Sequence, residues 1–372
     1  MKFTIEKNLL LENLANVVKA VSSKNIIPIL NGVKFDLNEE GLYLTASDSD
    51  LTIRSFIEKS SIKNVEKEGS IIVQSKYILD IIRFMPSDTI NFELLDGLKI
   101  KIYSDNSQYD LNCLDPKEYP SLKLEEVKDP IIVKGFLFKD IISQTSFAIS
   151  NQELRPLLTG LNFKIVGDVF ECIATDSYRL AKKTIKLDNP TEEEVNIVLP
   201  GKNIIELDHI ITDDENVEMH IFSNKVLFKY KNIIFQSNLL SGTYPNTNNL
   251  IPSEFSYMIN TKLGEYTSAI SRAALLTQSK EKNIVKMKIK NNQMIINSYA
   301  SEIGKVEIKL DVETNTETNI DISFSAKYML DALKTYKDED ILILLNGEVK
   351  PIVIKSATDE SLIQLILPIK TY

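Results

Sequence analysis

The sequence has few of the residues on which several protein classes depend. It contains two cysteines, two histidines and no tryptophan in 372 residues, with 12 glycines and 12 prolines. Two cysteines exclude a disulfide-rich scaffold and favour a reducing compartment. The glycine and proline content excludes collagen-like and low-complexity chains. No apolar run approaches the ~18 residues of a membrane-spanning helix, so we expect a cytoplasmic protein without a membrane segment.

The rest of the composition is that of an ordinary globular protein. Hydrophobic residues make up 43% of the chain and charged residues 26%, which suits packed cores and excludes an intrinsically disordered chain. The first residues, from Met1 to Lys7, alternate between apolar and polar, so we expect no secretory signal sequence. At ~100 to 200 residues per domain, the length predicts two to four domains.

The charge balance is acidic. Lysine and arginine number 43 and aspartate and glutamate number 52, which gives a formal net charge of -9. Affinity for nucleic acid comes from clustered lysine and arginine, so this balance counts weakly against such a partner. Total charge is only a sum, however, and one surface can be basic while another is acidic.

Several segments of the sequence recur at a nearly constant spacing. Residues 28–35 and 156–163 share a proline, a leucine, a glycine and a phenylalanine at an offset of 156 - 28 = 128, and Asp48 and Asp176 share the same offset. A lysine that precedes an acid by four residues occurs three times, at offsets of 126 and 125. These lysines are Lys76, Lys202 and Lys327. The copies close on Tyr119-Pro120, Tyr244-Pro245 and Tyr372. The chain therefore consists of three versions of one domain.

We predict that each copy is an α+β domain. Apolar residues near the start of each copy fall at helical spacing, and a second helix is expected to begin at each recurring lysine. The remainder alternates with a period of two, as in residues 98–103, which indicates antiparallel strands with one exposed face. Two helices are expected to lie on one face of a sheet in each copy. The predicted domains span residues 1–125, 126–250 and 251–372, close to 372/3 = 124 residues each.

The sequence contains no complete catalytic or cofactor-binding motif. Residues 201–202, Gly-Lys, resemble the end of a phosphate-binding loop, but Asn196 and Asn203 stand where that loop requires glycine and serine or threonine. His209 and His220 lack the partner spacing of a zinc site or a catalytic triad. We therefore predict a protein without catalytic residues, bound metal or cofactor.

Acidic and thiol side chains receive structural interpretations. Residues 213–215, Asp-Asp-Glu, taken alone have the composition of an acidic metal site. Acids also occur at Asp88 and Glu339, twelve residues after the other recurring lysines, so we interpret the cluster as a solvated turn. Cys113 and Cys172 fall in alternating stretches typical of strands, where a free cysteine is usually a small buried hydrophobe.

Two features are open to a functional interpretation. Lysines and arginines gather in and beside the predicted helices, either as a solvated surface or as helices that present positive charge to a phosphate backbone without base-specific contacts. The segment Leu365–Ile369 is unusually apolar for the end of a chain. It is interpreted either as the last strand of the third copy or as one wall of a groove for a hydrophobic peptide.

Several motifs together resemble one known family. They are Met1-Lys2-Phe3-Thr4, Pro28-Ile29-Leu30-x-Gly32, Ala174-Thr175-Asp176-Ser177-Tyr178-Arg179-Leu180, Tyr244-Pro245 through Ile251-Pro252, and Leu367-Pro368-Ile369. These motifs resemble those of the bacterial sliding clamp, the beta subunit of DNA polymerase III, and the resemblance covers the whole chain. The Ala-Thr-Asp-x-x-Arg-Leu motif is its most specific part.

The resemblance implies the DNA clamp fold and a head-to-tail homodimer that closes into a ring. Helices would line a central hole around double-stranded DNA, which is bound without sequence specificity, and sheets would form the outer wall. The implied function is a non-catalytic processivity factor of the DNA polymerase III holoenzyme, without a cofactor. The implied partners are the catalytic subunit of DNA polymerase III, a clamp loader, and other polymerases and repair proteins, with no membrane.

The functional positions of the family carry over to residues of this chain. The groove for partner peptides is expected between the second and third copies, at Leu158, Thr175, Ser177, Tyr178, Arg179, Leu180, Pro245, Leu250, Val349, Pro351, Leu365, Leu367, Pro368 and Ile369. The residues expected to face DNA are Lys24, Lys76, Gln152, Lys202 and Lys327. The subunit interface is expected to pair the region of Tyr109 and Leu111 with the region of Leu275 and Leu276 on the other chain.

Two other functions are alternatives to a clamp. A nucleic-acid-processing enzyme, or a polymerase subunit with its own active site, would consume nucleotides or degrade DNA and would lose that activity when one acid is changed. A protein scaffold that never encircles DNA would support replication unchanged after charge reversal at Lys24 and Lys202.

Overall fold

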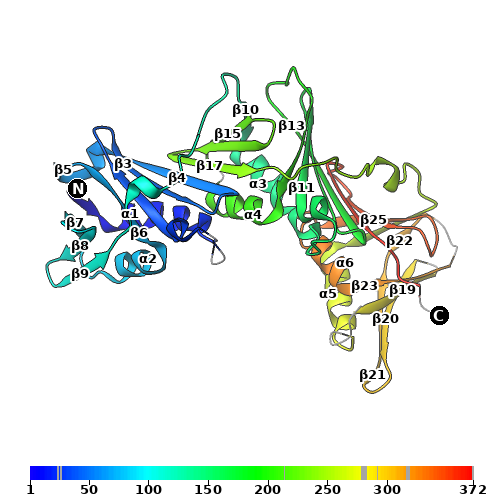
Figure 1. Ribbon diagram of the computed structural model, residues 1–372. Coiled ribbons are helices and arrows are strands. Elements are labelled where there is room, and N and C mark those ends of the chain that lie inside the picture. The colour runs from blue at the N-terminus through cyan, green and yellow to red at the C-terminus, as the bar shows by residue number, and fades with distance from the viewer. Residues whose placement is uncertain are drawn as a thin grey trace. The chain divides into compact units, whose positions relative to one another are not determined.

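The computed structural model describes residues 1–22, 25, 27–212, 214–277, 283–290, 292–315 and 319–370. Its α-helices occur as three pairs, one pair in each predicted copy (Figure 1). The pairs are α1 (Lys7–Val17) with α2 (Ser75–Phe84), α3 (Gly135–Ser143) with α4 (Gly201–Ile210), and α5 (Leu263–Ala274) with α6 (Ala326–Leu333). None of these helices is long and apolar enough to cross a membrane. The predicted pair of helices in each copy is confirmed.

The chain forms two compact units, and the first comprises Met1–Phe136 and Glu206–Leu239. This unit holds a five-stranded sheet in the order β5-β1-β7-β8-β9 and an eight-stranded sheet in the order β10-β15-β16-β17-β4-β3-β2-β6. The strands are β1 (Lys2–Glu6), β2 (Gly32–Leu37), β3 (Gly41–Ser47), β4 (Leu51–Glu58), β5 (Ile62–Lys67), β6 (Gly69–Gln74), β7 (Thr89–Leu95), β8 (Lys99–Ser104), β9 (Ser107–Asn112), β10 (Ile131–Lys134), β15 (Asn216–Ile221), β16 (Lys225–Tyr230) and β17 (Ile233–Asn238).

The second unit comprises Leu137–Ile205 and Leu240–Tyr372. It holds a nine-stranded sheet in the order β14-β11-β12-β13-β26-β25-β24-β18-β22 and a four-stranded sheet in the order β21-β20-β19-β23. The strands are β11 (Gly160–Val166), β12 (Val169–Thr175), β13 (Arg179–Lys186), β14 (Val195–Pro200), β18 (Tyr257–Lys262), β19 (Ile284–Lys290), β20 (Gln293–Ala300), β21 (Gly304–Asp311), β22 (Glu313–Thr314), β23 (Ile320–Ser325), β24 (Asp340–Leu345), β25 (Ile352–Ser356) and β26 (Leu362–Ile366).

Consecutive copies share a sheet in each unit. β4 of the first copy pairs with β17 of the second, and β13 of the second copy pairs with β26 of the third. We call these two strand pairs the first seam and the second seam. All of the ladders between named strands are antiparallel, as predicted, but the sequence did not predict that the sheets continue from one copy into the next.

The residues that recur in the sequence are the ones that shape turns. Pro28 and Pro156 are the first residues of 3-10 turns, η2 (Pro28–Asn31) and η6 (Pro156–Thr159), where a fixed φ and a missing N–H are tolerated. Each turn leads into a glycine, Gly32 or Gly160, that begins a strand. A Cβ at Gly160 would collide with the Leu199 carbonyl on the paired strand. Glycine is required there because the two backbones approach so closely.

The turn after the second helix makes the same backbone contact with the first helix in each copy. The backbone N–H of the first residue of the first helix donates to a carbonyl in the turn after the second helix in all three copies. These bonds join Lys7 to Asp88 at 2.8 Å, Gly135 to Glu215 at 3.0 Å, and Leu263 to Glu339 at 2.8 Å. One orphan N–H of each first helix is thus satisfied by the backbone of an acidic turn. Asp88, Glu215 and Glu339 thus lie in the turn after the second helix, as interpreted from the sequence, and Asp213 lies outside the described residues.

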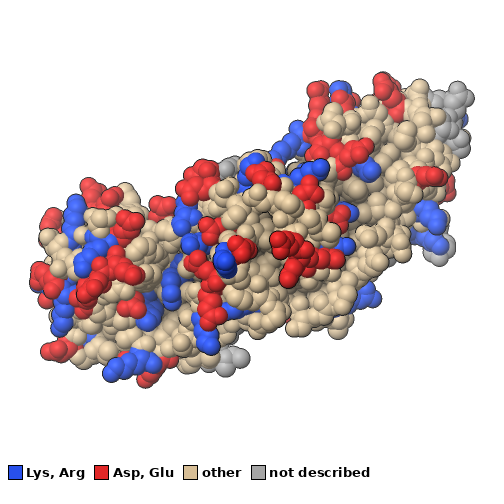
Figure 2. Space-filling view, turned by 90° about the horizontal axis from the view of Figure 1, so that it is seen from above, with Lys and Arg blue, Asp and Glu red and all other residues tan. Residues whose placement is uncertain are grey.

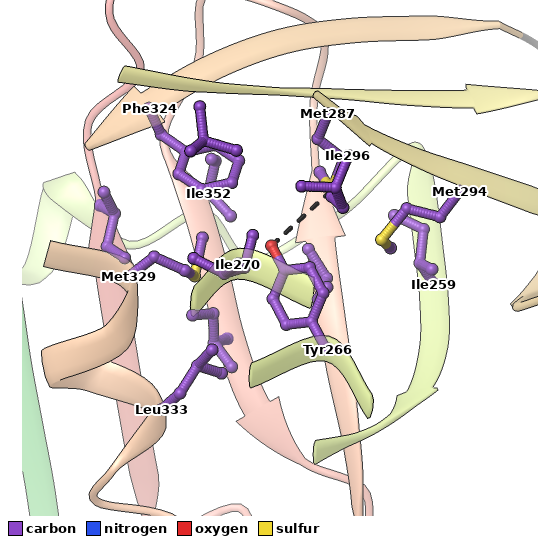
Figure 3. Close-up of a cluster of buried hydrophobic side chains, with 14 of the residues drawn as sticks. Ile259, Tyr266, Ile270, Met287, Met294, Ile296, Phe324, Met329, Leu333 and Ile352 are labelled. Carbon is purple, nitrogen blue, oxygen red and sulfur yellow. Dashed lines mark hydrogen bonds between the residues drawn. The ribbon is translucent and has the colours of Figure 1, made fainter. Parts of the chain in front are cut away.

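The packing of the third copy illustrates how the helices cover a sheet. Tyr266 and Ile270 of α5 and Met329 of α6 point into one cluster with apolar side chains of the strands (Figure 3). Tyr266 is fully buried, and its hydroxyl reaches the sulfur of Met287 at 3.7 Å. Burial raises the pKa of the Tyr266 hydroxyl, which therefore stays protonated.

Charged side chains of both signs lie interspersed over the face drawn in Figure 2. Most ion pairs are exposed ones, such as Arg83 with Asp80 at 2.8 Å, where the two side chains are 50% and 59% exposed. Pairs of this kind contribute ~0 to 1 kcal/mol each. The acidic net charge is therefore a property of the surface and does little to hold the fold together.

Candidate functional site

The second seam places an apolar floor between two copies of the domain. Leu180 on β13 lies opposite Leu365 on β26, which lies opposite Val353 on β25. These three side chains are 0 to 4% exposed. They belong to one cluster with Leu158, Ile173, Val198, Tyr244 and Leu344. Leu158, Leu180 and Leu365, which the sequence predicted as groove residues, are therefore brought together.

The turn that leads into β13 is fixed by its own hydrogen bonds. The Asp176 carboxylate accepts the backbone N–H groups of Tyr178 at 2.9 Å and Arg179 at 3.0 Å. Ser177 has a φ of 78°, in the left-handed region. Asp48 and Ser49 form the same turn in the first copy, where Asp48 accepts from Asp50 and Leu51 and Ser49 has a φ of 80°. The recurring aspartate thus makes a local turn that presents the next residues.

Thr175 ties this turn to the recurring tyrosine. Its hydroxyl donates to the Arg179 carbonyl at 2.6 Å, and its backbone N–H donates to the Tyr244 hydroxyl at 3.1 Å. Burial raises the pKa of the Tyr244 hydroxyl, so the phenol stays neutral. Tyr244 therefore anchors the segment before Pro245 on the sheet face that carries the apolar floor.

Arg179 is held by carboxylates and rings from both copies. Its Nε lies 3.0 Å from the Asp176 carboxylate, and its Nη1 lies 2.8 Å from the carboxylate of Asp331 on α6. The guanidinium carbon lies 4.5 Å from the ring centroid of Tyr328 and 5.2 Å from that of Phe147. Only 10% of the Arg179 side chain is exposed. Arg179 therefore has a supporting role, because two carboxylates and two rings of the chain already contact its guanidinium.

The rim of the candidate groove carries exposed apolar side chains. Tyr178 is 56% exposed and stacks on Tyr328, with ring centroids 6.4 Å apart and planes 27° apart. The backbone N–H of Leu367 donates to the Tyr178 carbonyl at 2.9 Å, and that of Ile369 donates to Ser323 at 2.7 Å. Leu367 itself is 38% exposed. The last described residues are therefore docked beside Tyr178, and their apolar side chains remain available to a partner.

The other predicted groove residues lie close in sequence to members of this cluster. Leu250 and Val349 are 50% and 63% exposed, while Pro245 is exposed and Pro351 and Pro368 are half-buried. No described hydrogen bond or cluster joins their side chains to the floor. The sequence prediction omitted Tyr328, Phe147 and Asp331, which hold Arg179 and Tyr178. Asp331 had a signal, since it is the recurring acid four residues after Lys327.

The residues predicted to face DNA occupy equivalent positions in the three copies. Lys76, Lys202 and Lys327 are each the second residue of the second helix, and all three are exposed. Gln152 is also exposed, and Lys24 lies outside the described residues. Each copy thus presents one exposed cation at the same position of its second helix, a type of group that can contact phosphate without reading bases.

The predicted interface residues lie on one edge strand and at the end of one helix. β9, with Tyr109 and Leu111, pairs within the described residues only with β8, so its other edge has free backbone groups. Tyr109 is 38% exposed and Leu111 is half-buried. Leu275, directly after α5, is 65% exposed, and Leu276 is half-buried. Unpaired edges with exposed apolar side chains are surfaces on which another chain can add a strand.

The remaining chemical groups have structural roles. Glu126, Glu218 and His220 come close enough together to hold a metal ion. His220 accepts the backbone N–H of Val127 on Nδ1 at 3.0 Å, so Nε2 of the neutral ring carries the proton and has no lone pair for a metal. Burial raises the pKa of Cys113 to about 11 and that of Cys172 to about 12, so neither thiol is a nucleophile at neutral pH.

Comparisons with known proteins agree with this geometry over the whole chain. Family descriptions for the N-terminal, central and C-terminal domains of the DNA polymerase III beta subunit match residues 1–123, 133–246 and 248–370. The chain belongs to the DNA polymerase III beta subunit family. The beta sliding clamp of Bacillus subtilis is 41% identical over 380 residues, and that of Staphylococcus aureus strain Mu50 is 36% identical over 377 residues, with both chains fully covered in each comparison.

Solved structures lead to the same assignment. The DNA polymerase sliding clamp of Bacillus subtilis matches with a TM-score of 0.96 at 40% identity, and the DNA polymerase III beta chain of Streptococcus pneumoniae matches with a TM-score of 0.95 at 33% identity. Each match covers all of both chains. The three α+β clamp domains are confirmed, and the function is that of a sliding clamp, a non-catalytic processivity factor of DNA replication.

Proposed function

We propose that two copies of this chain close head to tail into a ring around duplex DNA. The observation that carries this proposal is the exposed lysine at the second position of the second helix in all three copies. Six such helices in a dimer would face the phosphate backbone with weak point charges, together with Lys24 and Gln152. Contacts of this kind tolerate sliding because none of them depends on base sequence. Topology, more than affinity, then keeps the ring on DNA.

We also propose that the groove on the second seam binds apolar peptides of DNA polymerase III and of other polymerases and repair proteins, and that a clamp loader opens the ring in the cytoplasm. The buried floor of Leu158, Leu180 and Leu365 and the exposed rim of Tyr178 and Leu367 support this role. An aliphatic floor with few polar groups fixes the side chains of a peptide by burial of apolar area. We further propose domain boundaries near residues 125 and 250, which the ranges of the three family matches support.

The solution mass tests the ring. One chain has a mass of 42.2 kDa, so light scattering at micromolar concentration should give about twice that value. Leu275→Asp should lower the mass toward one chain by placing a charge on the interface, whereas Leu154→Asp, at a side chain that is 91% exposed, should not. A mass near 42.2 kDa for the unchanged protein would contradict the closed ring.

A further inference from the structure

A cavity of about 430 Å³ lies on the first copy, on the sheet formed by β2, β3 and β4. Cross-strand pairs place Lys34 beside Thr45, Asp36 beside Tyr43, and Thr45 beside Arg54, so these side chains share one face of the sheet. The wall of the cavity is the segment from Tyr119 to Leu122. The volume is in the range of small-ligand sites.

Arg54 is the cation of this cavity that forms no described ion pair, although the Asp36 carboxylate acts on it electrostatically. Its Nε donates to the Thr45 hydroxyl at 3.2 Å, and its guanidinium carbon lies 5.8 Å from the Tyr43 ring centroid. Among the described residues, no carboxylate lies within ion-pair distance of Arg54. Burial lowers the pKa of Arg54, while the nearby Tyr43, Asp36 and Tyr119 oppose this shift. The guanidinium therefore has donors to spare.

The acids nearest to the cavity are already bonded. Asp36 forms an ion pair with Lys34 at 3.3 Å, and Glu40 accepts the hydrogen bond of the Tyr43 hydroxyl. Lys34, Asp36 and Arg54 together leave one positive charge on the lining. A single carboxylate would balance that charge, whereas a phosphate dianion would need a second free cation.

The second copy carries an acid at a ladder position where the first copy has none. Lys182 and Glu171 stand 128 positions after Arg54 and Tyr43, at the same places in the ladder of β12 and β13. There the cation and the acid form an ion pair. The first copy keeps the cation and replaces the acid by the tyrosine Tyr43. Arg54 therefore has no acid at the ladder position from which Glu171 pairs with Lys182.

We propose that this cavity is a second ligand site of the protein, which binds the carboxylate of an acidic side chain on an extended peptide. The guanidinium of Arg54 would donate two hydrogen bonds to the oxygens of the carboxylate, over the ring of Tyr43. Tyr119 and Leu122 line the cavity and also belong to an apolar cluster with Ile29 and Leu30. An apolar residue beside the acidic one would cover this cluster. The cavity is much larger than a carboxylate alone, which favours a peptide over a free anion.

Arginine-selective NMR of the full-length protein tests the proposal. The chain has five arginines, so few Nε signals are expected. The signal that disappears in Arg54→Met is that of Arg54. The probe is the capped tripeptide Leu-Glu-Leu, with Leu-Gln-Leu as its neutral match. We expect a saturable shift of the Arg54 signal with the glutamate peptide, and an affinity at least about tenfold lower for the glutamine peptide. Arg83→Met, at an exposed pair on α2, should leave the affinity unchanged.

A change at Tyr43 gives a second, independent outcome. Tyr43→Glu rebuilds the ion pair of the second copy inside the first, and should abolish the shift because Arg54 then has an internal partner. Tyr43→Gln removes the ring without adding charge and should retain binding within about threefold. The proposal is wrong if the Arg54 signal does not move at millimolar peptide or if Tyr43→Glu binds as well as the unchanged protein. An equal shift with free acetate would contradict a peptide as the ligand.

Discussion

The two seams pair strands in the same register but carry different side chains. In the first seam Thr52 lies opposite Gln236, and in the second seam Leu180 lies opposite Leu365. The Thr52 hydroxyl is hydrogen-bonded to Ser47 at 2.8 Å, whereas both leucines belong to the apolar floor. One backbone arrangement thus supports buried and half-buried polar side chains in one unit and an apolar floor in the other. The fold repeats, and the binding surface is set by a few side chains.

Arg179 in the second unit and Arg54 in the first also differ, in how completely their charges are paired. Arg179 lies between two carboxylates and two rings, while Arg54 has a hydroxyl and one ring as its described partners. A buried cation that is fully paired holds a structure in place, and one that is incompletely paired is available to a ligand. Substitutions at the two seams and at the two arginines test whether these side chains cause the differences.

The largest effect is expected from giving the second seam the side chains of the first. Leu180→Thr with Leu365→Gln should remove the groove floor and lower affinity for a peptide of the polymerase catalytic subunit by at least about 100-fold, since two large apolar contacts are lost. Fluorescence anisotropy with a labelled peptide measures this. The reciprocal pair in the first seam, Thr52→Leu with Gln236→Leu, should leave peptide affinity within about twofold. If both double variants lost the same peptide affinity, the groove would lie elsewhere.

A smaller effect is expected from removing each arginine. Arg179→Met leaves Asp176 and Asp331 without their cation, and should lower the free energy of unfolding by about 3 kcal/mol. Arg54→Met breaks no described ion pair and should cost less than about 1 kcal/mol. Urea denaturation of both variants gives the comparison. A larger loss for Arg54→Met than for Arg179→Met would contradict the assignment of a structural and a free arginine.

The smallest effect is expected at the cysteine of the second copy. The pKa of Cys172 is about 12 in the folded protein against an ordinary value of 9.0, so above pH 9.0 the folded chain keeps a proton that the unfolded chain loses. The stabilisation is complete below that pH and is lost as the pH rises toward about 12. Between pH 8 and 10 the unchanged protein should lose about 1 kcal/mol more than Cys172→Ala.

Urea midpoints at the two pH values measure the cysteine effect. Comparison with Cys172→Ala is needed because buried tyrosines, such as Tyr244 and Tyr266, act in the same direction. Cys113, in the first copy, has a pKa of about 11 and is the cysteine with which Cys172 can be compared. Identical pH dependence in Cys172→Ala and the unchanged protein would show that the thiol ionises equally in both states.

Repetition made much of the fold predictable from sequence. Helix positions, the recurring lysines and the turn aspartates could be found because the same local requirement occurs at a fixed spacing. Gly160 and Pro156 recur because a turn and a close backbone approach allow few other residues. Such requirements are local and leave a mark in the sequence.

The sharing of sheets and the support of the groove were not predictable in this way. A strand that pairs with the next copy alternates like any other, so the pairing of β13 with β26 leaves no local sign. Arg179 and Asp331 lie 152 positions apart, and Tyr328 and Phe147 meet the guanidinium only after folding. The family resemblance supplied the groove residues, but not the side chains that hold them.

A protein held on DNA by topology leaves a DNA that has ends and stays on one that has none, so retention on the two forms distinguishes encirclement from ordinary affinity. The protein is loaded by a clamp loader onto a nicked circular duplex, free protein is removed, and half of the sample is linearised with a restriction enzyme. We expect the protein to stay on the circle and to leave the linear form within the time needed to slide off an end. Equal retention on both forms, or equal loss from both, would contradict an encircling clamp.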